Sequence, residues 1–287
     1  MNVVYLNGNY LPQEKATVSI MDRGFLFGDG VYEVIPVFDG KFFGFDEHIA
    51  RLEKSLRAIE MKNPHTTQEW KTIFETLLIQ NQKTTGNHSC YCQITRGADV
   101  SRSHTFSDNL KPTVVAFITP FKTQTLEQLE NGFSAITSDD TRHRNCFIKA
   151  INLLPNILQM QKAKSAGAVE TILIRNGEVS ECTSSNIFIV KNNQLMTPPL
   201  SENILSGITR QLIIKLAKEN NIQCIEKTIT PDMLKTADEI WVTGSIKEIC
   251  PIISVDGQIV GNGKVGPLWK KMVALYEAQK HVHGDHA

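Results

Sequence analysis

The stretch "ETILIRNGEVSECTSSNIFIV", residues 170–190, decides the fold of the second half of the chain. Two runs rich in β-branched residues flank an Asn-Gly pair at 176–177, and this pair favours a tight hairpin turn. A further apolar run at 186–190 predicts a buried strand. Glu181 stands just before that run, so its carboxylate is either solvated in a turn or directed inward at a cationic partner.

More strand-forming runs follow toward the C-terminus. They lie at 186–199, with a turn at 192–193, at 239–244 and at 250–260. Two helical patterns interrupt them, one after Pro155 and one from about Thr209. The second half is therefore expected to form a barrel-like sheet with helices.

The first half of the chain mixes amphipathic helices with strands. Residues 46–60 have helical spacing, with Asp46 as the predicted N-cap and Arg51 near the first turns. A capping box from Thr66 to Glu69 predicts the start of a second helix. The predicted strands are 31–38 and 41–45, joined by a turn at 39–40, then 89–97 and 113–120.

These patterns predict an α+β protein with two domains. A chain of 287 residues with 41% hydrophobic and 21% charged residues is long enough for two cores. The smaller N-terminal α/β domain is placed at 1–120, a connector at 121–130, and the larger C-terminal barrel-like domain at 131–287.

Charge and cysteine usage limit the classes of partner. Lys+Arg and Asp+Glu are equal at 30 each, so no strong field attracts nucleic acid or an anionic membrane, and a small-molecule partner is expected. The 6 cysteines form no CxxC pair and the N-terminus lacks a signal pattern, which predicts a cytoplasmic protein. No metal site is expected, because the histidines lack metal-binding spacing and the tail "HVHGDHA", 281–287, is interpreted as a frayed terminus.

A lysine in an apolar run is the first candidate for chemistry. In "RNCFIKAINLLPN", residues 144–156, Lys149 is flanked on both sides by apolar residues. Such a lysine either extends its ammonium to the surface or is retained for chemistry.

Two small-residue turns are candidate anion sites. In "LSGITRQLIIKLA" a Ser-Gly turn leads into a helix through Thr209, where free N–H groups and the helix dipole attract an anion, although this stretch taken alone is more typical of a plain N-cap. The turn after strand 239–244 contains Ser245 and offers a second, weaker site. A lysine, an acid that faces a ring nitrogen and hydroxyl-rich turns for a phosphate are together what pyridoxal 5'-phosphate requires.

With these residues in this order, the chain resembles the fold-type IV (class IV) pyridoxal-phosphate-dependent aminotransferases, and within them most closely the bacterial D-amino-acid branch. The resemblance covers nearly the whole chain. It is carried by "DRGFLFGDGVYEV", "EHIARL", "QITRG", "RSH", "IKAINLLPN", "NGEVSECTSSNIF", "ILSGITR", "EIWVTGSIKEICPI" and "GNGKVGP".

The resemblance implies roles for particular residues and an assembly. Lys149 would form the imine with the cofactor and carry the proton, and Glu181 would face the ring nitrogen. The residues implied around the phosphate are Arg51, Ile208, Thr209 and Ser245, and Leu205 would pack against the ring. The resemblance also implies that the cofactor lies between the two domains and that two chains form a homodimer.

The substrate is the point at which members of this family differ. Arg102 and His104 are two residues apart, so in an extended segment they lie on the same side and suit one carboxylate, unless they are simply solvated loop residues. In the D-amino-acid branch an Arg-x-His triplet binds the substrate α-carboxylate with a tyrosine that matches Tyr32, in part from the neighbouring subunit. Ser101 replaces the proline common before this arginine, which is expected to loosen the loop. The turn 244–247 also has fewer hydroxyls than is common in the family.

The expected activity is transamination between a D-amino acid such as D-alanine and a 2-oxo acid such as 2-oxoglutarate. The alternatives are a branched-chain L-amino-acid aminotransferase and an aminodeoxychorismate lyase, which share the fold. A non-catalytic protein of this fold is disfavoured by the intact set of Lys149, Glu181 and Thr209.

Overall fold

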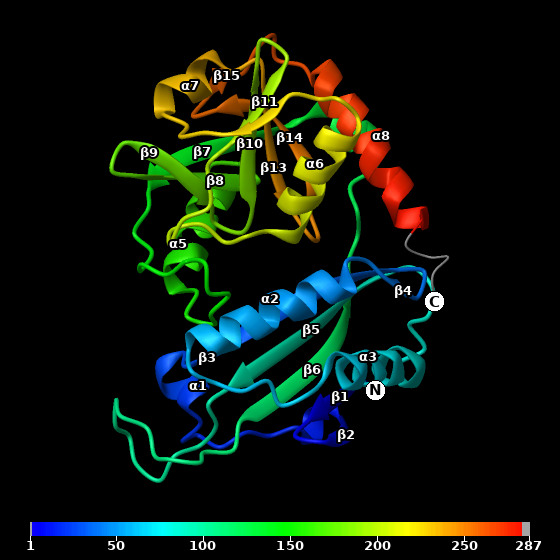
Figure 1. The fold of residues 1–287 in the computed structure, drawn as a ribbon, viewed down its shortest axis with the longest axis vertical. Coiled ribbons are helices and arrows are strands. Elements are labelled where there is room, and N and C mark those ends of the chain that lie inside the picture. Colours follow the sequence, from blue (N-terminus) through cyan, green and yellow to red (C-terminus); the bar gives the residue numbers. More distant parts are fainter. Residues whose placement is uncertain (1, 283–287) are drawn as a thin grey trace. The chain divides into compact units, whose positions relative to one another are not determined.

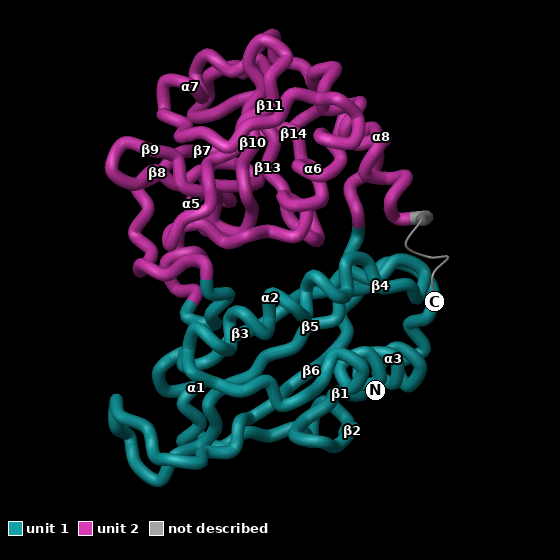
Figure 2. The backbone as a smooth tube through the Cα atoms, in the orientation of Figure 1, with its two compact units in different colours: residues 1–122, 148–152, 287 teal, residues 123–147, 153–286 magenta. Residues whose placement is uncertain are grey.

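The computed structural model describes residues 2–282, and it divides the chain into two compact units (Figures 1 and 2). Unit 1 comprises residues 2–122 and 148–152, and unit 2 comprises residues 123–147 and 153–282. Most of the expected frayed tail, 283–287, lies outside the described residues. Lys149 therefore belongs by its contacts to unit 1, although the chain on both sides of its segment belongs to unit 2.

Unit 1 is built on an antiparallel sheet. Its strand order is β2-β1-β6-β5-β3-β4, with β1 Val3–Leu6, β2 Asn9–Pro12, β3 Gly30–Phe38, β4 Lys41–Phe42, β5 Asn87–Thr95 and β6 Thr113–Pro120. Its helices are η1 Gln13–Lys15, α1 Arg23–Phe27, α2 Phe45–Ala58 and α3 Thr67–Gln80. The longest pairing, β3 with β5, runs from Gly30 opposite Thr95 to Phe38 opposite Asn87.

The core of unit 1 lies between this sheet and the helices α2 and α3. Leu52 and Leu56 of α2 and Trp70, Phe74 and Leu77 of α3 are fully buried, as their helical spacing predicts. The predicted capping box of α3 is confirmed by reciprocal Thr66 and Glu69 hydrogen bonds. The predicted N-cap Asp46 is wrong. A left-handed Gly44 with φ 68° starts α2 at Phe45, and Asp46 lies in its first turn.

Unit 2 contains the larger sheet. Its order is β12-β11-β10-β13-β14-β7-β8-β9, with β15 paired to β14. The bounds are β7 Phe133–Asp139, β8 Glu170–Arg175, β9 Glu178–Cys182, β10 Asn186–Lys191, β11 Gln194–Thr197, β12 Cys224–Glu226, β13 Glu239–Gly244, β14 Glu248–Val255 and β15 Gln258–Ile259. The sheet is mixed, because β14, β7 and β8 run parallel to one another and β11 is parallel to β12. The strand order runs from β12 at one edge to β9 at the other, so the sheet is open. The predicted barrel-like sheet is therefore present as a sheet that does not close on itself.

The hairpins predicted in unit 2 are confirmed. β8 and β9 join through Asn176 and Gly177, with φ values of 53° and 79°, and β10 and β11 join through Asn192 and Asn193, at 50° and 61°. Two successive positive φ values match the twist of the flanking strands, which is why Asn and Gly occupy these turns.

Helices complete unit 2. They are α4 Leu126–Asn131, α5 Leu154–Ser165, α6 Ile208–Glu219, α7 Pro231–Thr236 and α8 Pro267–Val282. The segment expected to be a connector, 121–130, thus contributes to α4, which Thr125 caps. Within residues 2–282, none of the helices has the length and apolar character that a membrane span needs.

Candidate active site

The segment that carries Lys149 is hydrogen-bonded to the start of β3. The Lys149 carbonyl accepts from the Tyr32 N–H at 3.0 Å, and the Ile151 N–H donates to the Gly30 carbonyl at 3.1 Å. The Lys149 N–H donates to Ser55 Oγ of α2 at 3.2 Å. The half-buried side chain places Nζ 4.3 Å from the centroid of the Tyr32 ring, where a cation is attracted by the π face. The main chain of Lys149 is thus fixed, and its amine lies beside Tyr32.

Arg51 lies in a buried cluster of charged side chains in unit 1. Its Nε and Nη2 donate to the two carboxylate oxygens of Glu33 at 2.7 and 2.9 Å, and His48 Nδ1 lies 2.9 Å from Glu33 Oε2. Burial raises the pKa of Glu33, but Arg51 and His48 overcome this and hold it well below its usual range. Arg51 is therefore held in a fixed orientation, and its predicted role at the phosphate stays a prediction.

This cluster predicts a pH dependence of stability. Burial lowers the pKa of His48 below its ordinary value of 6.5, despite Glu33. As the pH falls below 6.5, the unfolded chain therefore binds a proton before the folded one, which favours unfolding. We expect the loss of stability between about pH 7 and about pH 5 to be smaller in His48→Gln, measured as the urea midpoint at each pH. An equal loss in the wild type and the variant would contradict a neutral buried His48.

Arg102 and His104 lie in the loop between β5 and β6, and both are exposed. The structure brings them together on one ring of α1. The Arg102 guanidinium carbon is 5.0 Å from the Phe27 centroid, and the His104 ring lies edge-on to Phe27 at 5.7 Å. Tyr32, the third predicted carboxylate ligand, lies on β3 and stacks on Tyr91 at 5.7 Å.

Glu181 is buried at the end of β9 in unit 2. It is paired with Arg142, and its Oε2 accepts from the Leu205 N–H and from Asn186 Nδ2, both at 3.1 Å. Burial raises the pKa of Glu181 to about 7, although Arg142 and the Leu205 N–H act in the opposite direction. The sequence left two alternatives for the Glu181 carboxylate, solvated in a turn or directed inward at a cationic partner. In the structure it is directed inward, and Arg142 is its cationic partner.

Arg142 was missed in the sequence because "SDDTRHRN" has the composition of a solvated loop. Its Nη2 donates to Asp140 Oδ2 at 2.8 Å and its Nε to Asp140 Oδ1 at 2.9 Å. Burial lowers the pKa of Arg142, but Asp140 and Glu181 raise it above its ordinary value, so the guanidinium stays charged. Asn186, also missed, links the site further by donating to the Leu205 carbonyl at 2.9 Å.

Three of the residues predicted to bind the phosphate lie in unit 2: Ile208 and Thr209 at the start of α6, and Ser245 in the turn after β13. α6 begins at Ile208 after Gly207 without a side-chain cap, which leaves first-turn N–H groups available to an anion. A Cβ at residue 207 would lie 2.0 Å from Asn186 Oδ1, so any other residue there would force the Asn186 side chain to shift. Thr209 is buried, whereas Ser245 is half-buried in the turn after β13.

One buried hydroxyl in this region suggests that the site takes a ligand. Thr243 is 1% exposed at the end of β13, and its Oγ1 has no hydrogen-bond partner among residues 2–282. An unpartnered buried hydroxyl is costly, and a phosphate oxygen is the kind of acceptor that satisfies it. The inward carboxylate of Glu181, the uncapped α6 start and Thr243 therefore fit a cofactor with a ring nitrogen and a phosphate.

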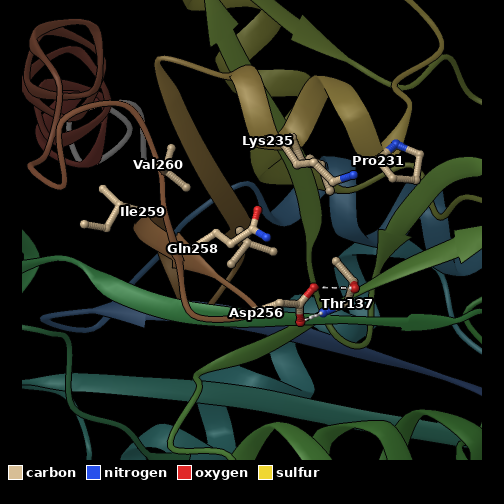
Figure 3. A pocket seen from close by; sticks show the side chains of 9 residues that line it. Thr137, Pro231, Lys235, Asp256, Gln258, Ile259 and Val260 are labelled. Atoms are coloured by element: carbon tan, nitrogen blue, oxygen red, sulfur yellow. Dashed lines mark hydrogen bonds between the residues drawn. The ribbon is translucent and has the colours of Figure 1, made fainter.

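The hollow drawn in Figure 3 lies elsewhere in unit 2. Its lining residues are Thr137, Pro231, Leu234, Lys235, Val255, Asp256, Gln258, Ile259 and Val260. Asp256 is held on one wall by accepting from Thr137 N and Oγ1 at 2.8 and 2.6 Å. None of the predicted site residues lines it, and residues 2–282 contain no cluster of His, Cys, Asp and Glu suited to a metal ion.

Comparison with known proteins decides the family. The model of the family described as "Amino-transferase class IV" matches residues 30–255. The chain belongs to the class IV aminotransferases. This family uses pyridoxal 5'-phosphate, in agreement with the groups gathered in unit 2.

Individual class IV aminotransferases are similar to this chain over most of its length. The D-alanine aminotransferase of Bacillus licheniformis is 43% identical over 269 residues, 94% of either chain. That of Staphylococcus aureus (strain COL) is 37% identical over 284 residues, 99% of either chain. Among solved structures, the Escherichia coli branched-chain amino acid aminotransferase has a TM-score of 0.89 and 29% identity, over 96% of this chain and 94% of that chain.

Proposed function

We propose that this class IV aminotransferase transfers the amino group of a D-amino acid such as D-alanine to a 2-oxo acid such as 2-oxoglutarate, with pyridoxal 5'-phosphate as cofactor. One observation carries the proposal, namely the identity of 37–43% with D-alanine aminotransferases over nearly the whole chain. The match covers 92–99% of this chain, so it is not confined to one of its two units.

The branched-chain L-amino-acid reaction is the second candidate. It is favoured by solved structures of similar fold, among them the Escherichia coli branched-chain amino acid aminotransferase, which shares 29% identity with this chain. The presence of Arg102 and His104 together on Phe27 favours the D-amino-acid reaction, because this pair offers guanidinium and imidazole donors for one carboxylate. The lyase alternative would release pyruvate without an amino acceptor.

When bound, pyridoxal 5'-phosphate supplies a carbonyl that condenses with amines and a ring that accepts electron density. Lys149 Nζ would remove the proton from the substrate Cα and would hold that proton until it is returned. The Tyr32 face limits the directions open to Nζ, and the hydrogen bonds of the Lys149 main chain fix its base. One amine thus serves as base and then as acid.

Glu181 is assigned as the counter-ion of a protonated ring nitrogen. Arg142, the Leu205 N–H and Asn186 hold its oxygens in place, so little reorganisation is needed when charge develops. The first turn of α6, Thr209, Ser245 and Arg51 are assigned to the phosphate. Leu205 is assigned to the ring face.

A substrate screen tests the proposed function. D-alanine, D-glutamate, D-aspartate and L-leucine are each assayed with and without 2-oxoglutarate. We expect turnover of the D-amino acids only when the 2-oxo acid is present. A preference for L-leucine would establish the branched-chain reaction, and pyruvate release from aminodeoxychorismate without acceptor would establish the lyase.

Replacing Arg102 tests the assigned carboxylate site. Arg102→Met keeps the aliphatic stem but removes every donor, and a charge-assisted contact contributes roughly 1.5 to 3 kcal/mol. We expect kcat/KM for D-alanine to fall by about one to two decades, with cofactor absorbance unchanged. Arg57→Met, at an arginine whose side chain is 70% exposed, is the matched control. D-alanine kinetics within about twofold of wild type would place the carboxylate elsewhere.

Assembly and location complete the proposal. A homodimer is supported by Leu154, Ile157 and Leu158, which lie on one face of α5 and are 66%, 60% and 57% exposed. Sedimentation velocity tests the homodimer, and a monomer at assay concentration would refute it.

A cytoplasmic location is supported by the free thiols of all the cysteines. Recovery of the protein in the periplasmic fraction of the cell would refute this location.

A further inference from the structure

The loop that carries Arg102 and His104 is a long excursion between β5 and β6. Figure 1 shows this segment leaving the end of the unit 1 sheet and returning to it. Asp99 closes its base, because its carboxylate accepts from the Ser107 N–H at 3.0 Å, from Ser107 Oγ at 2.7 Å and from the Val100 N–H at 2.7 Å. The part between 99 and 107 needs another support to keep one shape.

Arg23, the first residue of α1, supplies that support. Its Nη1 donates to the Ser103 carbonyl at 2.7 Å and to the Thr105 carbonyl at 3.4 Å, and its Nη2 donates to the His104 carbonyl at 3.0 Å. Three successive carbonyls therefore turn toward one buried guanidinium, which is 4% exposed. Without a cation, the three carbonyl dipoles would repel one another and turn to water.

The Arg23 side chain is also held by a residue outside the loop. Its Nε donates to Asp29 Oδ2 at 2.9 Å, an oxygen that also accepts from Arg96 Nε at 2.9 Å. Burial raises the pKa of Asp29, but the two arginines lower it below its ordinary value, so the carboxylate stays charged. Arg96 lies over the Phe106 ring at 4.0 Å, which ties the far side of the loop to the same cluster.

Phe27 links this support to the substrate side of the loop. The Arg23 guanidinium carbon is 4.9 Å from the Phe27 centroid, on the ring that Arg102 and His104 also contact. Two residues of the short helix α1 thus orient the loop. Arg23 binds the main chain of residues 103–105, and Phe27 contacts the side chains of Arg102 and His104. We propose that Arg23 is a positioning residue for substrate carboxylate recognition, and that it acts by holding residues 103–105 so that Arg102 and His104 meet over Phe27. The effect of Arg23 on substrate binding rests on the proposed function, whereas its support of the loop does not.

Hydrogen exchange tests the structural part without any substrate. Arg23→Lys keeps the charge but cannot donate to three carbonyls and Asp29 at once. We expect faster amide exchange in peptides covering 99–107 and unchanged exchange in β3, relative to wild type and to the control Arg57→Lys. Unchanged exchange in 99–107 would overturn the inference, and so would faster exchange spread over all of unit 1.

Steady-state kinetics test the functional part. We expect the KM for D-alanine to rise about tenfold in Arg23→Lys, with kcat changed less than about threefold, because the loop misplaces a binding group rather than the reacting amine. An unchanged KM despite faster loop exchange would overturn the positioning role. A wild type that does not use D-alanine would refute the proposed function, while the exchange measurement still decides whether Arg23 holds the loop.

A second pair of variants covers the case in which Arg23→Lys fails to fold. Phe27→Leu removes the ring that Arg102 and His104 share and leaves every Arg23 hydrogen bond in place. Phe25→Leu, at a residue of the same helix that is 72% exposed, is the matched control. We expect a raised KM for D-alanine only in Phe27→Leu, and equal KM values in the two variants would count against the inference.

Discussion

Lys149→Ala is expected to abolish transamination while the protein stays folded. The variant loses the amine that carries the proton, and losses of this kind reach about 10³-fold or more. Folding should persist, because the Lys149 N–H and carbonyl hydrogen bonds to Ser55 and Tyr32 are made by the main chain and remain in alanine. Turnover of D-alanine with 2-oxoglutarate is the measurement, with circular dichroism and the thermal midpoint as checks of folding.

Lys164→Ala is the matched control for this prediction. Lys164 is an exposed lysine of α5, so its removal tests for a general effect of losing one positive charge. We expect wild-type turnover in the control. Substantial transaminase activity in Lys149→Ala would remove Lys149 from the site and leave its ammonium as a surface group beside Tyr32.

Glu181→Gln is expected to lower turnover by about 10²-fold, in line with the loss of one preorganised electrostatic group. Glutamine keeps the shape and can still accept from the Leu205 N–H, but it carries no charge to stabilise a protonated ring nitrogen. The cofactor should still bind. The measurements are kcat and the absorbance of the bound cofactor.

Glu181→Gln is expected to fold, because Arg142 has a second carboxylate partner, Asp140. After the change, Arg142 remains paired with Asp140 through its Nε and Nη2, so no buried cation is left alone. Glu178→Gln is the control on the same strand, because Glu178 is exposed at the start of β9. Equal turnover in the two variants would mean that the Glu181 carboxylate serves stability only.

Local patterns allowed much of the fold to be predicted from the sequence. Asn176-Gly177 specifies its own hairpin, and the Thr66 to Glu69 capping box specifies its own helix start. The N-cap of α2 is not the predicted Asp46, because the chain enters this helix through the left-handed Gly44 and not through a capping side chain.

The site was only partly predictable, because long-range partners give its residues their roles. Glu181 was chosen from the sequence, but the Arg142 that pairs with it is 39 residues away in a polar segment without a motif. Likewise, Ser101 suggested a loose loop, whereas the structure supports that loop through Arg23, about 80 residues earlier. Arg142 has no local signal, and the motif that contains Arg23 does not indicate which distant carbonyls its guanidinium binds.

The placement of residues 148–152 in unit 1 has a consequence for the order in which the chain can be completed. During synthesis, β3 emerges more than a hundred residues before the segment that supplies the Lys149 carbonyl to Tyr32 N–H and the Ile151 N–H to the Gly30 carbonyl. A nascent chain that ends at residue 122 therefore has every helix and strand of unit 1 but an unfilled place beside β3. The segment 148–152 is synthesised only after the start of unit 2, so Lys149 is added to a sheet whose strands have all been made.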